Sequence, residues 1–497
     1  MNESLKSRFI SGAFWVSILT TGALFLGFGR SWLLARIDAS GELLGVFATL
    51  FIFVNLAISV GLFGGNTALS SFIPKIQAED KARGFLKAYL FITLLWWVLA
   101  LIILISSPSV FQLFAGRELD AASIVPLVSL GTVAVLGQVF ILNFQGHLRY
   151  REAAILMNFQ PYVLTVIILL AYLFFADAFR IHANTWLLFL FIGINALALI
   201  IGFLQNGNFS FFKEKCFVPS GFFRFACIYQ FSSLLIFVYG NVDRLFILDR
   251  LGIQELGFYF LIMQISALIT FVPKRMGQVM LSTFSRLLAE GKSESLNRGY
   301  SRLCRIVTCF SLGVALFFVL FSREFCVIFG QELASRSDWL IYLSVAACIG
   351  ALGNINSMIV LSREKMITYL GMNVAVVLTQ CVATWAWVGP YGIEGVISAR
   401  MMAGILGQIL LFIVVFRLQG SGANCIKEYL VCVAFCCTAA CLALFYGEMA
   451  IAYRVLIFVA LFTIFLKVNR FTTREFTDVV PAKLKQTLQQ MFHKVTT

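Results

Sequence analysis

The chain has 497 residues, of which 60% are hydrophobic and 12% are charged, and its net charge is +14. An ordinary soluble domain carries about 25% charged residues, so this composition excludes a soluble globular fold and indicates an integral membrane protein. The positive charge does not indicate a nucleic-acid partner, because most of the 38 lysines and arginines fall in segments assigned to one side of the membrane.

Fourteen apolar segments are long enough to cross a bilayer, which takes about 20 residues of helix each. With a cytoplasmic N-terminus, this even number places the C-terminus in the cytoplasm as well, and the basic residues then gather inside. The sequence therefore predicts an all-α integral membrane protein. The spans are expected near residues 10–34, 43–65, 88–107, 122–145, 153–176, 186–205, 222–247, 254–273, 302–322, 338–361, 367–389, 393–416, 428–447 and 451–468.

An internal repeat organises these spans. The run Leu44–Gly45–Val46–Phe47, where the second span begins, is echoed by Leu256–Gly257–Phe258–Tyr259, where the eighth begins. Equivalent positions lie roughly 212 to 216 residues apart, and such a repeat in a membrane chain indicates two facing helix bundles with a substrate site between them. We expect pseudo-symmetric six-helix lobes at 1–210 and 215–418, two additional transmembrane helices at 428–468, and a cytoplasmic amphipathic tail at 474–497.

Neither a cofactor nor a metal site is expected. The chain has no phosphate-cradling GxxxxGK[ST] motif. Four cysteines step along one predicted span, but no histidine lies in that span to complete a metal site, so packing explains them better. They are Cys432, Cys436, Cys437 and Cys441. The connections are too short for an extramembrane catalytic domain, so the sequence does not predict an enzyme.

The clearest ionisable residues inside predicted spans are Arg30, Asp243, Arg244 and Arg400. Each costs at least about 2.5 kcal/mol on insertion scales, so each calls for a partner or a water-filled cavity. Arg30 is close enough to the outer surface that snorkelling is an alternative to a cavity position. Arg400 shares its helix face with Gly404 and Gly407, which allow close helix packing or leave room beside the guanidinium group.

The seventh span is polar on one face. At about 100° per residue, Gln230, Asn241 and Arg244 share that face, whereas Asp243 points away from it. Asp243 is then a counter-charge to a basic residue, a group that couples transport to protons or sodium, or one half of a static salt bridge. In the second span, Asn55 and Asn66 belong to a similar polar stripe, which interhelical hydrogen bonding would also explain.

Three arginines and one acid give the predicted interior a net positive charge. The planar guanidinium group matches phosphate oxygens with a fork of donors. The interior therefore favours an anionic substrate that bears phosphate, and we expect Asn55, Asn66, Gln230 and Asn241 to contact it beside the arginines.

Two sequence patterns carry a family resemblance. They are GLFGGNTAL at 61–69 and NVDRLFILDRLGIQELGFYFLIMQI at 241–265, the second followed by a basic connection. With these patterns, and over essentially its whole length, the chain resembles the bacterial polysaccharide-repeat-unit flippases for O-antigen or exopolysaccharide. Those proteins belong to the multidrug/oligosaccharidyl-lipid/polysaccharide exporter superfamily.

The resemblance implies a flippase that moves an undecaprenyl-pyrophosphate-linked oligosaccharide repeat unit from the inner to the outer leaflet of the bacterial cytoplasmic (inner) membrane. It implies alternating access coupled to an ion gradient. The family's cationic cavity maps onto Arg30, Arg244 and Arg400, and its acid in the seventh helix maps onto Asp243. Membrane lipids are expected partners, and the resemblance suggests a polysaccharide polymerase and a chain-length regulator as further ones.

Three other functions stay open at this point. A peptidoglycan lipid-precursor flippase would share the mechanism and the charged headgroup. A multidrug extruder of the same fold would be expected to have an acidic interior for cationic drugs. A membrane polysaccharide polymerase or ligase usually needs a large outer loop with catalytic residues, and the outer connections here are short.

Overall fold

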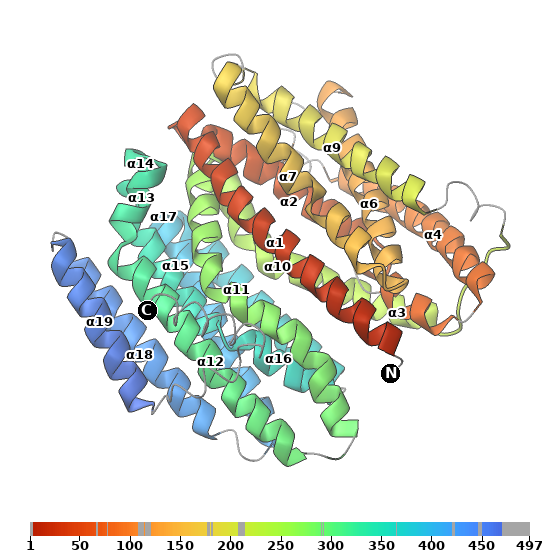
Figure 1. Cartoon of the computed structure of the whole chain (residues 1–497). Helices are drawn as coiled ribbons and strands as arrows, with labels where there is room; N and C mark the ends of the chain where they lie inside the picture. Colours follow the sequence, from red (N-terminus) through yellow and green to blue (C-terminus); the bar gives the residue numbers. More distant parts are fainter. Residues whose placement is uncertain are drawn as a thin grey trace, which may run out of the picture. The chain divides into compact units, whose positions relative to one another are not determined.

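The computed structural model describes residues 3–65, 68–76, 78–107, 114, 121–175, 179, 182–206, 214–289, 291, 293–363, 365–419, 423–445 and 450–469. Every regular element within these ranges is helical (Figure 1). In the same ranges, 13 helical stretches are long and apolar enough to cross a membrane. The prediction of an all-α, multi-pass membrane protein is thus confirmed, while the tail expected at 474–497 lies outside the described residues.

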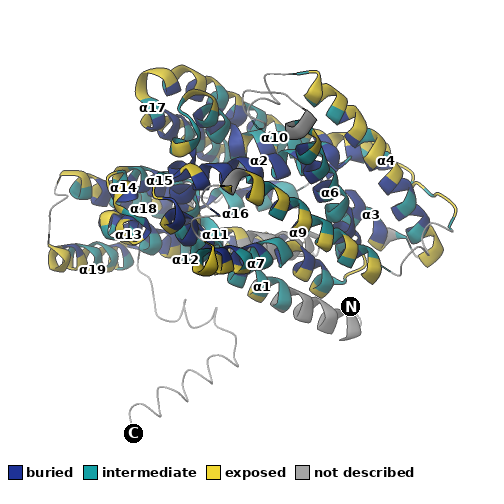
Figure 2. Ribbon diagram, turned by 90° about the horizontal axis from the view of Figure 1, so that it is seen from above, coloured by how far each residue is buried: buried dark blue, intermediate teal, exposed yellow. Residues whose placement is uncertain are grey.

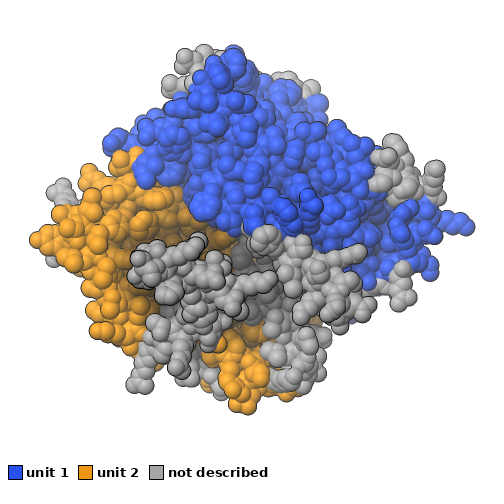
Figure 3. Space-filling model, viewed as in Figure 1, with its two compact units in different colours: residues 1–261, 328–332, 380–396 blue, residues 262–327, 333–379, 397–497 orange. Residues whose placement is uncertain are grey.

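Two compact units make up the chain, coloured separately in Figure 3. The first comprises residues 1–261, 328–332 and 380–396, and the second comprises 262–327, 333–379 and 397–497. Helix α11 (Ile253–Ala289) therefore contributes its first turns to one unit and the rest to the other. The lobes predicted at 1–210 and 215–418 were defined by the sequence repeat, whereas these units are defined by compactness. The lobes therefore stay a prediction.

The first unit is built around a core of buried Phe, Leu, Ala and Trp side chains, such as Phe85, Trp97 and Phe222. Within it, α1 packs along α7, and α2 packs against α6, α9 and α10. Besides the first turns of α11, the helices of this unit are α1 (Glu3–Ile37), α2 (Glu42–Gly61), α3 (Ala68–Phe72), η2 (Ile73–Lys75), α4 (Glu79–Ile105), α6 (Ala121–Gly146), α7 (Tyr150–Phe174), α9 (Ala183–Gln205) and α10 (Phe222–Arg250).

In the second unit, α12 packs against α15, α18 and α19. Its helices, of which α13, α14 and α17 also give residues to the first unit, are α12 (Ser293–Leu320), α13 (Ser322–Phe329), α14 (Gln331–Ala334), α15 (Ser337–Gly350), α16 (Gly353–Ser362), α17 (Met366–Gln419), α18 (Ala423–Phe445) and α19 (Ile451–Val468).

Two predicted spans differ in detail from the observed helices. The span at 338–361 is broken into α15 and α16 at Ala351–Leu352. Helix α17 has 54 residues and holds both spans predicted at 367–389 and 393–416. It is interrupted at Gly392, whose φ of 56° and ψ of −136° are non-helical, two residues after Pro390. Proline cannot donate to the helix ladder and glycine tolerates positive φ, so the chain turns between the two spans there.

The outward faces of several helices are apolar, as a lipid environment requires. On α4, Leu95 and Ile102 are 72% and 57% exposed, and on α19 Leu456 is 64% exposed. Figure 2 shows these two helices lined with exposed residues in yellow. A contiguous apolar surface of this kind is unusual on a soluble monomer and suits a membrane-facing helix.

The repeated glycines lie against each other where α2 and α11 begin. A Cβ added to Gly45 would lie 1.9 Å from the carbonyl oxygen of Ile253, and one added to Gly257 would lie 2.2 Å from the carbonyl oxygen of Gly41. At a spacing of about 212 residues, Gly41 corresponds to Ile253 and Gly45 to Gly257. The two close approaches are therefore reciprocal, which is the pattern that two-fold related segments produce.

Charged side chains fasten α18 and α19 within the second unit. Arg454 of α19 donates through Nη1 to both carboxylate oxygens of Glu324, at 2.7 Å each, and to the carbonyl of Leu320 at 3.3 Å. Near the other end of the same helix, Arg305 of α12 pairs with Glu428 of α18 (Nε to Oε1, 3.0 Å) and donates to the carbonyl of Asn469 at 2.6 Å. We call these contacts the two charge clamps.

Candidate functional site

Arg30 of α1 lies inside the first unit with its guanidinium group on an aromatic ring. Only 7% of the residue is exposed, and its Cζ lies 4.4 Å from the centre of the Phe47 ring on α2. Among the described atoms, its buried Nε has no hydrogen-bond partner. This position favours a cavity or an anion over simple snorkelling, because a buried, unsatisfied N–H is costly.

Arg244 of α10 is placed in a closely similar way. Its Cζ lies 5.3 Å from the centre of the Phe260 ring on α11, and its Nη1 donates to Oδ1 of Asn241 at 3.2 Å. Asn241, one turn earlier, donates in turn to the carbonyl of Phe237 at 3.0 Å. Asn241 and Arg244 thus share one face of α10, as the helical spacing predicted.

The rings of Phe47 and Phe260 connect the two arginines. They meet edge to face with their centres 5.8 Å apart, and Phe51 of α2 touches both, at 6.4 and 5.9 Å. We call Phe47, Phe51 and Phe260 the aromatic floor. Sequence reasoning missed it, because nothing in the pattern separates these three from the other phenylalanines among 52.

Asp243 points away from Arg244 and into the interface between α10 and α11. The side chain is fully buried; its Oδ2 accepts a hydrogen bond from the hydroxyl of Tyr259 at 2.6 Å, and its Oδ1 accepts one from the backbone N–H of Arg244 at 2.9 Å. The hydrogen bond from Tyr259 joins α11 to α10, and in the low-dielectric interior it is a strong polar contact between the two helices.

Two short turns set the register of these helices. Before α2, Oδ2 of Asp38 accepts from the N–H of Leu43 at 3.0 Å, and Gly41 adopts a φ of 82°. Between α10 and α11, the N–H groups of Leu251 and Gly252 both donate to the carbonyl of Ile247, and Gly252 has a φ of 100°. Both turns need a glycine with positive φ, and they fix where Phe47 and Phe260 fall.

Gln230, expected to contact substrate, has its amide engaged with the end of α2. Its amide nitrogen Nε2 donates to the carbonyls of Ser59 and Val60 at 3.0 and 3.1 Å, and its Oε1 accepts from the N–H of Gly64 at 3.1 Å. These bonds satisfy backbone groups at a helix terminus. A contact between Gln230 and substrate stays a prediction.

The structure gives fewer contacts for the other predicted residues, Asn55, Asn66 and Arg400. Asn55 donates to the carbonyl of Phe51 within its own helix at 2.9 Å, and Asn66 lies outside the described residues. Arg400 is half-buried on α17 in the second unit, so its place beside Arg30 and Arg244 stays a prediction. On its face, a Cβ on Gly407 would lie 3.2 Å from Val376, whereas one on Gly404 would meet no described atom within 4 Å.

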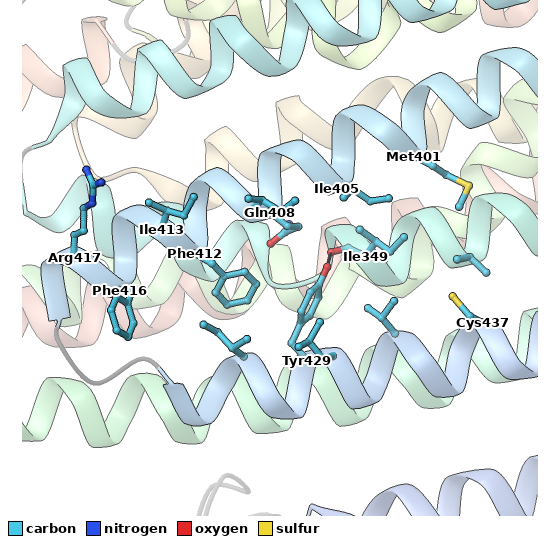
Figure 4. A pocket seen from close by; sticks show the side chains of 15 residues that line it. Ile349, Met401, Ile405, Gln408, Phe412, Ile413, Phe416, Arg417, Tyr429 and Cys437 are labelled. Carbon is cyan, nitrogen blue, oxygen red and sulfur yellow. Dashed lines mark hydrogen bonds between the residues drawn. The ribbon is translucent and has the colours of Figure 1, made fainter.

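The second unit contains an apolar cavity of about 700 Å³ between α15, α17 and α18 (Figure 4). Tyr429 stands in its wall and donates to the carbonyl of Ile349 at 2.6 Å, while Gln408 and Arg417 add polar groups. Its size and lining suit a hydrocarbon chain. The lining residues are Val345, Ile349, Met401, Ile405, Gln408, Ile409, Phe412, Ile413, Phe416, Arg417, Ile426, Tyr429, Leu430, Val433 and Cys437.

Two of the buried cysteines, Cys348 of α15 and Cys432 of α18, contact each other. The sulfur atoms of Cys348 and Cys432 lie 3.5 Å apart, and Cys432 also approaches the carbonyl of Thr308 at 3.7 Å. Within the described part of the chain, no group of three or more His, Cys, Asp and Glu side chains is arranged to hold a metal ion.

Comparisons with known proteins agree with this architecture. A family model described as a polysaccharide biosynthesis protein matches residues 9–288. The chain is similar to a solved structure of the lipid II flippase MurJ in an inward-closed conformation, with 13% sequence identity, a TM-score of 0.68, and coverage of 91% of this chain and 98% of that one. Comparison with curated protein sequences gave no match.

Two further solved structures extend the likeness. An inward-facing multidrug resistance MATE family transporter of the MOP superfamily has 16% identity and a TM-score of 0.61, with coverage of 80% of this chain and 96% of that one. A MOP superfamily transporter from Pyrococcus furiosus has 15% identity and a TM-score of 0.57, with coverage of 84% and 96%. The chain therefore has the fold of this transporter superfamily.

Proposed function

Because the chain belongs to the polysaccharide biosynthesis protein family, we propose that it is a flippase for an undecaprenyl-pyrophosphate-linked oligosaccharide repeat unit. The substrate would pass from the inner to the outer leaflet of the bacterial cytoplasmic membrane by alternating access, with no bond made or broken. One observation carries the proposal: two arginines within predicted membrane helices, Arg30 and Arg244, lie on one aromatic floor.

Each candidate residue has a role in this mechanism. The guanidinium groups of Arg30 and Arg244 bind the pyrophosphate, since charge-assisted bonds to phosphate oxygens are strong where water is scarce. Arg400 is proposed as a third cation, and Asn55, Asn66, Gln230 and Asn241 as polar contacts to sugar. An apolar cavity such as that in the second unit suits the hydrocarbon tail. An ion gradient supplies the energy, with Asp243 as the coupling group.

The test is translocation in liposomes that contain the purified protein and a fluorescent undecaprenyl-diphosphate oligosaccharide, followed by access of the sugar to an external lectin. Arg30→Gln and Arg244→Gln should each slow translocation roughly 10- to 100-fold, because each removes a charge-assisted hydrogen bond to phosphate. Arg36→Gln and Arg250→Gln, exposed arginines on the same two helices, are the matched controls. Wild-type rates in both Arg30→Gln and Arg244→Gln would remove this assignment.

A peptidoglycan lipid-precursor flippase is the second candidate, favoured by the similarity in fold to MurJ. Such a substrate carries the same diphosphate, so the arginine pair would serve it equally well. Depletion of the protein in cells separates the two functions. A halt in growth with accumulated peptidoglycan precursor would support the second candidate, whereas loss of surface polysaccharide with continued growth would support the first.

A further inference from the structure

Gln408 of α17, in the wall of the second unit's apolar cavity, is buried with an unused hydrogen-bond acceptor. The residue is 6% exposed, and its Oε1 has no hydrogen-bond partner among the described atoms. A Cβ added to Gly353 would lie 2.6 Å from Nε2 of Gln408, so the amide nitrogen packs against the start of α16. Figure 4 shows Gln408 and Tyr429 reaching into the cavity from α17 and α18. A buried acceptor without a donor costs about 1–3 kcal/mol, so a ligand that supplies a donor there gains affinity.

The cavity is open along the exposed side of α17. Two of its lining residues, Ile409 and Phe416, are 51% and 50% exposed in a helix apolar enough to cross a membrane. The lining on α17 runs from Met401 to Arg417, which corresponds to about 24 Å of helix. This length is most of the hydrocarbon thickness of a bilayer, which is about 30 Å. A hydrocarbon chain can therefore enter from the membrane and lie along the helix.

The depth of Gln408 restricts the kind of ligand that can reach it. Along α17, Gln408 lies about 13 Å from Arg417 near the helix end, and therefore deep in the hydrocarbon region. A phospholipid keeps its charged phosphate at the membrane surface, because a charge near the bilayer centre is costly, and its acyl chains carry no donor for Oε1. A hydroxyl group is uncharged, and donation to an amide oxygen offsets the cost of its own burial.

Water suits this position less well. A buried water molecule typically makes about three hydrogen bonds. Near Gln408, the other polar side chain that reaches the cavity is Tyr429, whose hydroxyl already donates to the carbonyl of Ile349 at 2.6 Å. Most of the lining side chains are aliphatic or aromatic, and cavities with such walls take up apolar molecules in preference to water.

We propose that this cavity binds a neutral lipid alcohol, whose hydroxyl group donates to Oε1 of Gln408 and whose hydrocarbon chain lies along α17 and α18. The inference goes beyond the proposed function, because this ligand carries no diphosphate and its recognition does not involve Arg30 or Arg244. The tail of a lipid diphosphate fits the same apolar walls, but it brings no donor to Gln408.

Two photoreactive probes test the inference. One is hexadecanol with a diazirine in its chain, and the other is the methyl ether of the same molecule, which cannot donate a hydrogen bond. The purified full-length protein in lipid nanodiscs is titrated with each probe and irradiated, and mass spectrometry identifies the labelled peptides. We expect labelling of α17 and α18 to reach half-saturation at a concentration roughly 3- to 10-fold lower for the alcohol than for the ether.

Three variants locate the contact. Gln408→Leu removes the acceptor at similar volume, so both probes should then label alike. Gln380→Leu is the matched control, because Gln380 is also a fully buried glutamine of α17 but does not line the cavity; it should keep the preference for the alcohol. Val433→Phe fills part of the cavity and should reduce labelling of α17 and α18 by both probes.

Three results would overturn the inference. Equal half-saturation by the alcohol and the ether in the wild type would mean that the cavity accepts any hydrocarbon chain, that of the proposed substrate included. A preference for the alcohol that survives Gln408→Leu would place the acceptor elsewhere. Labelling that Val433→Phe leaves unchanged would place both probes outside the cavity. None of these results bears on the translocation test of Arg30 and Arg244.

Discussion

At the scale of single residues, Asp243 serves the fold and is a candidate for function at once. Its carboxyl group joins α10 to α11 through the hydroxyl of Tyr259, and it also accepts from the backbone N–H of Arg244 within α10. The sequence left Asp243 as a counter-charge, a coupling group or half of a salt bridge. In the structure, its carboxyl group accepts a hydrogen bond between two helices. The next residue in the chain is Arg244, which lies over the aromatic floor. A substitution of Asp243 would therefore alter the surroundings of Arg244 directly.

Asp243→Asn separates the two roles. Asparagine keeps an acceptor for Tyr259 but carries no charge, so the protein should stay folded while its translocation rate no longer responds to an imposed proton or sodium gradient. Tyr259→Phe is the structural counterpart: it removes a buried donor to the Asp243 carboxyl group and should lower the free energy of unfolding by about 1–3 kcal/mol. Unfolding in mixed micelles measures the second effect, with the exposed Tyr239→Phe of α10 as the control. If the translocation rate of Asp243→Asn still responded to the gradient as the wild type does, Asp243 would be excluded as the coupling group.

Some of these residues could be predicted and others could not. Arg30, Arg244 and Asp243 stand out because charge is rare in an apolar span, and helical spacing correctly separated Asp243 from the face of Asn241 and Arg244. Phe47 and Phe260 look like any lipid-facing or core phenylalanine until both helices are packed. The engagement of Gln230 with the end of α2 was equally hidden, since it depends on a turn at Gly64 and Gly65 with positive φ.

At the scale of helices, the reciprocal glycine contact is the tightest feature of the first unit. Each glycine of the pair meets backbone atoms of the other helix, which cannot move aside as a flexible side chain could. Hydropathy predicted the two spans and the repeat predicted that the glycines correspond. Their contact with each other needed the three-dimensional arrangement, as did the break between α15 and α16, which interrupts a continuous apolar run.

Gly45→Ala should separate α2 from α11 and lower the free energy of unfolding by about 1–3 kcal/mol, the usual cost of overpacking. Gly257→Ala should behave in the same way, because its Cβ would meet backbone atoms of Gly41 and Gly45. The control is Gly193→Ala in α9, where an added Cβ meets no described atom within 4 Å; it should leave stability unchanged or raise it slightly. Thermal unfolding followed by gel filtration measures all three, and a wild-type melting temperature in Gly45→Ala would contradict the close contact.

At the scale of the whole molecule, the distribution of basic residues predicts an orientation in the membrane, and cysteine labelling can test it. Cys216 is exposed in the connection between α9 and α10, which is predicted to be cytoplasmic. Cys326 of α13 is buried, and burial raises the pKa of its thiol to about 12. It therefore stays protonated at neutral pH and should not react.

A variant that keeps Cys216 alone should be labelled by a membrane-impermeant maleimide in inside-out vesicles and not in intact spheroplasts. Ser335→Cys in the cysteine-free background, at an exposed position in the connection predicted to lie outside, should give the opposite pattern. Labelling of Cys216 from outside would reverse the predicted orientation, and with it the assignment of both termini to the cytoplasm.

The two charge clamps have a consequence for chains that end early. A nonsense mutation just before α18 would delete Glu428 and Arg454, leaving Glu324 and Arg305 without these opposite charges. It would also delete Tyr429 from the apolar core and expose the core residues that remain, such as Ile355. Such a shortened product would be a substrate for membrane proteases, so truncating alleles in this gene would behave as complete losses even though every arginine of the proposed binding site is still encoded.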